Sequence, residues 1–124
     1  MPIPFGVSKD DILRSKVITP GWYVAVVKSV NTKAAKTDSS MNVIFTFRLI
    51  GGSYDGTPVD ALFSEKAPGF AVPLMEALLK RKVNPEGEQF DFEKAVGQEL
   101  LVYIKNEEYQ GRMLNKAADF KPKV

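Results

Sequence analysis

Residues 41–56 read MNVIFTFRLIGGSYDG, and the alternation within them decides the predicted fold. Apolar residues occupy every second position from Val43 to Leu49, which is typical of a strand with one buried face. Glycines follow at residues 51–52 and 56, where they supply the positive φ that a tight reversal needs. The stretch therefore predicts a central strand that enters a hairpin, with Tyr54 held at the tip.

Length and composition are those of a single globular domain. The chain has 124 residues with a formal net charge of +2. A charge this small does not by itself suggest a nucleic-acid partner. No run approaches the roughly 18 apolar residues of a membrane span, and no signal peptide pattern opens the chain. The chain lacks cysteine, which fits a reducing compartment. We therefore expect a cytoplasmic protein without a membrane partner.

The residue types present argue against catalysis. Histidine is absent along with cysteine, which removes the usual general base near neutral pH and the commonest zinc ligand. The acidic residues do not cluster at ligand spacing: Asp55 and Asp60 flank a hairpin, and those from Glu86 to Glu93 follow a helix. The sequence therefore predicts a protein that is not an enzyme and has no cofactor and no metal.

The remaining chain predicts four more strands and one helix. Residues 1–20 look like an N-terminal arm, in which Ser8 and Asp11 form a capping box for a short helix over Lys9–Arg14. From Pro68 to Lys82 the apolar residues no longer alternate but fall at helical spacing, which predicts a helix over this range. The strands are expected at 21–30, 41–50, 57–64, 99–106 and 112–120, with a polar connection over 31–40 and a hairpin loop over 107–111.

This order, three strands followed by one helix and two strands, is the chain order of the OB-fold. That fold is a five-stranded Greek-key barrel, all-β apart from its helix. We therefore predict an OB-fold domain over residues 21–124, preceded by the arm. Its binding face should lie between the 31–40 loop and the 107–111 hairpin.

The distribution of charge and of aromatic residues favours single-stranded nucleic acid as the ligand. Between residues 21 and 50 there are four cationic side chains and one acid, Asp38. Aromatic residues lie among the cations, and sequence-tolerant binders combine phosphate neutralisation with base stacking. The predicted binding residues are Trp22, Lys28, Lys33, Lys36, Arg48, Tyr54, Tyr103, Lys105, Tyr109 and Arg112.

Several of these residues also have a purely structural interpretation. Arg48 is the strongest candidate because it points outward from the central strand. Trp22 is open between packing under the arm and stacking on a base, whereas Tyr103 should lie outside the barrel. Tyrosines at hairpin tips, here Tyr54 and Tyr109, pack against their own loop as often as they bind a ligand.

Short motifs distributed over residues 20–122 resemble a family of bacteriophage single-stranded DNA-binding proteins of OB type. They are GWYVAVV at the start, IFTFRLIGGSYDG, VGQEL before a strand, EEYQG, Asn115, and Phe120 before Pro122. The resemblance implies coating of exposed DNA strands during phage replication or recombination, with replication or recombination proteins and a homo-oligomer as further partners. Many such binders end in an acidic tail, whereas this chain ends DFKPKV. We therefore expect either that partner recruitment differs here or that the chain is shorter than a full-length relative.

The sequence thus predicts an OB barrel that binds single-stranded DNA with little sequence preference. Two other functions stay open. The first is a viral structural or assembly module that uses the barrel to bind protein, which would show a flat apolar patch around Ile44, Val24 and Val26. The second is an oligosaccharide-binding barrel, which would show aromatic residues without a basic track.

Overall fold

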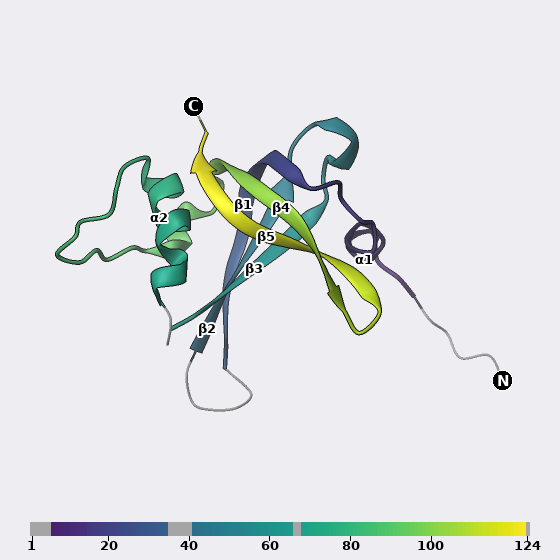
Figure 1. Ribbon diagram of the computed structural model, residues 1–124, viewed down its shortest axis with the longest axis horizontal. Helices are drawn as coiled ribbons and strands as arrows, with labels where there is room; N and C mark the ends of the chain where they lie inside the picture. Colours follow the sequence, from purple (N-terminus) through teal and green to yellow (C-terminus); the bar gives the residue numbers. More distant parts are fainter. Residues whose placement is uncertain (1–5, 35–40, 66–67, 124) are drawn as a thin grey trace.

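A computed structural model describes residues 6–34, 41–65 and 68–123, which form one antiparallel sheet with two helices (Figure 1). Helix α2 lies between the third and fourth strands, so the predicted order of elements is confirmed. The strands are β1 (Gly21–Ala34), β2 (Met41–Leu49), β3 (Pro58–Ser64), β4 (Glu99–Tyr109) and β5 (Arg112–Pro122), and the helices are α1 (Lys9–Arg14) and α2 (Val72–Leu79).

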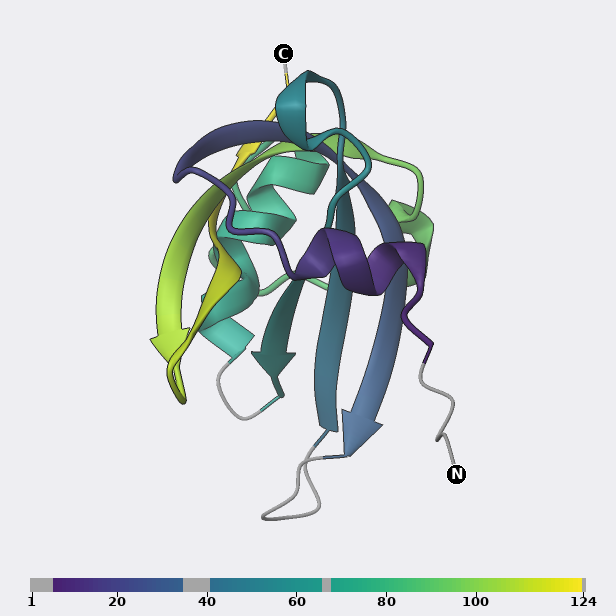
Figure 2. The ribbon, with the colours of Figure 1, turned by 90° about the vertical axis from the view of Figure 1, so that its right-hand side faces the viewer.

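The sheet has the strand order β3-β2-β1-β4-β5, and its long central strand β1 serves two neighbours. Residues 21–26 of β1 pair with β4 and residues 25–34 pair with β2, with a bulge in the β2 ladder at Lys28. Such a bulge increases local twist, and the sheet is strongly curved (Figure 2). In the described residues no ladder joins the edge strands β3 and β5, although the rings of Phe63 and Phe120 are only 6.2 Å apart.

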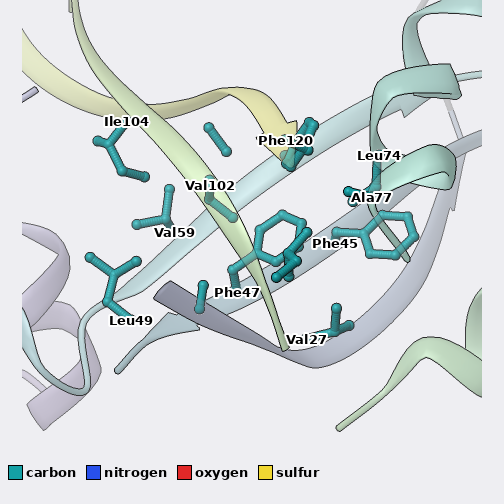
Figure 3. Packing of buried hydrophobic residues seen from close by; sticks show 14 of the residues in the cluster. Val27, Phe45, Phe47, Leu49, Val59, Leu74, Ala77, Val102, Ile104 and Phe120 are labelled. Carbon is teal, nitrogen blue, oxygen red and sulfur yellow. The ribbon is translucent and has the colours of Figure 1, made fainter. Parts of the chain in front are cut away.

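The alternation in the central strand defines the core as predicted. Phe45 and Phe47 are fully buried, and their rings lie 5.9 Å apart in a stacked arrangement. They meet Val102 of β4 and Leu74 of α2 in one cluster (Figure 3). Helix α2 thus covers the inner side of the curved sheet with its own buried residues, Leu74, Ala77 and Leu78.

Local signals place both helices close to their predicted limits. The capping box is present, since Ser8 accepts from the Asp11 amide and Asp11 accepts from the Ser8 amide. These hydrogen bonds lower the pKa of Asp11. In α2 the proline lies in the first turn, as its missing amide requires. The α-helix ends at Leu79 rather than Lys82, because Lys80 takes a left-handed conformation with φ of 60°.

Two predicted loops are shorter in the structure. Strand β1 continues to Ala34 through a segment expected to be a polar connection, and it pairs there with β2. Asn31, Thr32 and Lys33 are all exposed, so the backbone ladder with β2, and not burial of a face, continues the strand here. The β4–β5 hairpin likewise keeps only Gln110 and Gly111 outside its strands, both with positive φ, as a two-residue turn requires.

The segment after α1 belongs to the core. Ile18 is completely buried, and its amide donates to the side chain of Asn115 at 2.9 Å. Asn106 donates to the Ile18 carbonyl at 3.0 Å. Helix α1 itself packs less closely, since Leu13 is half-buried and Ile12 is 51% exposed. The arm is therefore fixed firmly at Ile18, which follows α1 in the chain, and more loosely at α1 itself.

Candidate nucleic-acid interface

A groove of about 790 Å³ lies between the edge strands β3 and β5. One side carries the apolar residues Ile44 and Leu62, which are cross-strand neighbours on β2 and β3. The other side carries Lys105 of β4 and Lys116 of β5. Phe70, which is 78% exposed, also lines the groove. A surface with cations facing apolar and aromatic groups has the chemistry that binds a strand of nucleotides.

The two lysines come together through the register of the β4–β5 hairpin. Tyr109 pairs with Arg112 next to the turn, and the same register places Lys105 directly opposite Lys116. Lys116 also forms a diagonal ion pair with Glu107, with 3.2 Å between its Nζ and the carboxylate. Among the described residues no acid forms an ion pair with Lys105, so on the outer face of this part of the ladder Lys105 and Lys116 face the single acid Glu107.

Farther along the same outer face, Trp22 and Tyr103 form an aromatic cluster. They are direct neighbours on β1 and β4, and their ring centroids are 5.4 Å apart in an edge-to-face arrangement. The Lys121 ammonium lies 4.2 Å from the centroid of the Trp22 ring. Trp22 therefore packs against β4 and β5 rather than under the arm, and Lys121 covers one of its faces.

The hairpin end presents the most accessible aromatic ring among the predicted binding residues. Tyr109 is 60% exposed, and its cross-strand partner Arg112 is exposed as well. Because alternate residues of a strand share a face, Tyr103, Lys105 and Tyr109 lie in one row on β4. The hairpin thus brings five predicted residues onto one outer surface, namely Trp22, Tyr103, Lys105, Tyr109 and Arg112.

Tyr54 lies apart from that surface. Its hydroxyl is hydrogen-bonded to the backbone amide and the hydroxyl of Thr19, at 3.2 and 2.9 Å, and these contacts lower the pKa of Tyr54. Its ring packs edge-to-face on Tyr23 at 5.8 Å. Tyr54 therefore joins the arm to the β2–β3 connection, a role that the hairpin pattern alone did not reveal.

The remaining predicted cations lie on β1 and β2. Arg48 is half-buried beside α1, where it lines a cavity of about 330 Å³ with Lys9 and Leu13. Lys28 is exposed at the bulge of β1, and Lys33 is exposed near the end of that strand. Lys36 lies outside the described residues. The structure thus separates Arg48 from the pair Lys105 and Lys116, and the binding role of each cation stays a prediction.

Of the residues that line the groove, only Lys105 is a predicted binding residue, and the pattern along the chain did not mark Leu62, Phe70 or Lys116. The position of Lys116 could be predicted from the sequence, because a two-residue turn at 110–111 sets the register that places Lys116 opposite Lys105. Leu62 could be identified as outward by its alternation with Ala61 and Phe63. No local signal marks Phe70, since its position depends on how the chain returns from β3 to α2.

Within the described residues, no three acidic side chains lie close enough to hold a metal ion. Neither helix in the described ranges is long and apolar enough to cross a membrane. In comparisons with known proteins, no family model matches the chain and no curated protein resembles it significantly.

Proposed function

We propose that this protein binds single-stranded DNA with little sequence preference and without catalysis. The proposal includes an OB-type barrel, in which β3 and β5 are the strands brought together by the curvature of the sheet. The strand order β3-β2-β1-β4-β5 and the helix after β3 support that classification. The family resemblance adds a role in phage replication or recombination within the bacterial cytoplasm.

The observation that carries the proposal is the groove between β3 and β5. Lys105 and Lys116 supply two adjacent cations on one wall, and Leu62 and Phe70 supply apolar surface opposite them. A phosphate backbone lying along the lysines would direct its bases toward that apolar surface. Such contacts recognise the charge and the flat face that all nucleotides share, so they give affinity without reading the base sequence.

A titration of labelled oligo-dT by fluorescence anisotropy tests this function. We expect binding that weakens with salt, with a log–log slope of about 0.7 for each phosphate neutralised. Duplex DNA of the same length should bind more weakly, because its paired bases cannot reach the groove. Equal affinity for the duplex, or no binding of oligo-dT at low salt, would contradict the proposal.

A protein ligand is the second candidate, and the apolar side of the groove favours it. Leu62 is 58% exposed and Phe70 is 78% exposed. An extended peptide could use these residues, since peptides bind at sheet edges such as β3 and β5. The salt dependence separates the two candidates, because apolar peptide binding would lack the steep slope of a polyanion.

Tyr109 provides a test of base stacking that is separate from charge. Tyr109→Ala should weaken oligo-dT binding by about 1–3 kcal/mol while leaving the salt slope nearly unchanged. Tyr109→Phe keeps the ring and should bind as the unmodified protein does. An abasic oligonucleotide should bind the unmodified protein more weakly than oligo-dT does. Tyr109→Ala should weaken the binding of the abasic oligonucleotide little further. If both substitutions leave oligo-dT binding unaltered, Tyr109 does not stack on bases.

A further inference from the structure

Asp60 is an acidic residue within the otherwise cationic and apolar groove. It lies on the outer face of β3, directly opposite Thr46 of β2, and it lines the groove together with Lys105 and Lys116. Its side chain is 43% exposed, so a ligand in the groove would meet its charge. A carboxylate at this position opposes the binding of any polyanion.

Both oxygens of this carboxylate have partners. The hydroxyl of Thr46 donates to Oδ1 at 2.9 Å, and the guanidinium of Arg14 donates to Oδ2 at 2.6 Å. Thr46 is nearly buried, so its hydrogen bond fixes the direction of the carboxylate. The pair with Arg14 supplies the opposite charge, and it joins residues that are 46 positions apart in the sequence.

Arg14 reaches β3 because of how the arm is anchored. It is the last residue of α1, which lies across the outer side of the strands (Figure 2). The chain is then held immediately behind the helix, where Asn115 donates to the Lys16 carbonyl at 2.7 Å and Ile18 is buried. The arm therefore delivers one positive charge to the acid of the groove.

We infer that Arg14 is a positioning residue for nucleic-acid binding, which neutralises Asp60 so that the groove accepts an anionic strand. The inference rests on the proposed function. Arg14 acts through the carboxylate and not by holding a phosphate itself. Without Arg14, the Asp60 charge would repel phosphates bound at Lys105 and Lys116, and at separations of several ångströms this repulsion reduces affinity about tenfold at low salt.

Four proteins test the inference by oligo-dT titration at low and moderate salt: the unmodified chain, Arg14→Ala, Asp60→Asn and the double variant. We expect Arg14→Ala to bind about tenfold more weakly, and the double variant to return within about threefold of the unmodified chain. Asp60→Asn should bind at least as tightly as the unmodified chain. Asparagine keeps the Oδ1 acceptor for Thr46 and removes only the charge.

The double variant separates charge from loosening of the arm, because both proteins without Arg14 lack the same anchor. Arg81→Ala is the matched control, since Arg81 forms a comparable pair with Glu88 at 2.8 Å outside the groove, and its loss should leave binding unchanged.

Unaltered binding by Arg14→Ala overturns the inference, as does tighter binding, which would make α1 a cover that the ligand displaces. Weak binding by the double variant, with a salt slope reduced by about 0.7, also overturns it, because Arg14 would then hold a phosphate directly. If the unmodified chain fails to bind oligo-dT, the proposed function itself is wrong.

Discussion

Replacing Lys105 and Lys116 together by alanine is expected to weaken oligo-dT binding roughly ten- to hundredfold at low salt. Each lysine can lie about 4 Å from a phosphate, where such a charge pair contributes about 1 kcal/mol in water, so the two lysines together contribute about 2 kcal/mol. Removing both should also lower the magnitude of the log–log salt slope by about 1.4, since each phosphate contributes about 0.7 on a single strand. The loss should be the same for oligo-dT and for mixed sequences, because phosphates carry no base information.

A second double variant provides the control for total charge. Lys80→Asn combined with Lys94→Ala also removes two positive charges, but at positions that do not line the groove. Asparagine suits position 80 because it tolerates the left-handed conformation found there. This control should retain most of the affinity and the slope. An equal loss in both double variants would mean that binding depends on overall charge, and the groove would not be the binding site.

Phe45→Ala is expected to lower the free energy of unfolding by about 3–5 kcal/mol, which is a large share of the stability of a domain this size. Phe45 is fully buried, and its ring contacts those of Phe47, Phe63 and Phe92 at centroid distances of 5.9, 5.9 and 5.0 Å. Alanine would leave a cavity bordered by rigid rings that cannot all move to fill it. Urea denaturation followed by circular dichroism measures the change.

Phe70→Ala is the matched control for this experiment. The same residue type is removed, but Phe70 is 78% exposed and lies on the rim of the groove. Its replacement should change the free energy of unfolding by no more than about 0.5 kcal/mol. If Phe45→Ala costs less than about 1 kcal/mol, the stacked phenylalanines do not form the core of the folded protein.

The predicted binding residues were found by type and by strand alternation, and the structure shows the limits of both. Alternation identified Tyr103 and Arg48 as outward, and both lie on the outer face of the sheet. It could not show that α1 lies beside Arg48, nor that Thr19 binds the hydroxyl of Tyr54. These contacts join distant parts of the chain, and periodicity describes only the surroundings of each residue along its own strand.

The helices and strands of this protein, and the residues of its core, follow from patterns that are visible within a single chain. Alternation from Val43 to Leu49 defined the buried face of β2, helical spacing defined α2, and Ser8 with Asp11 defined the start of α1. These features depend on neighbours within a few positions, so a single chain displays them. The end of β1 was missed because pairing with β2, not local composition, decides where that strand stops.

Which outward residues share a surface depends on tertiary contacts and not on any local pattern. The groove exists because the curvature of the sheet brings β3 and β5 together, which depends on the β1 bulge and on the packing of all five strands. The pair of Arg14 and Asp60 likewise depends on the anchoring of the arm at Ile18. The same outward positions on a flat sheet would place Leu62 and Lys116 at opposite edges, with β2, β1 and β4 between them.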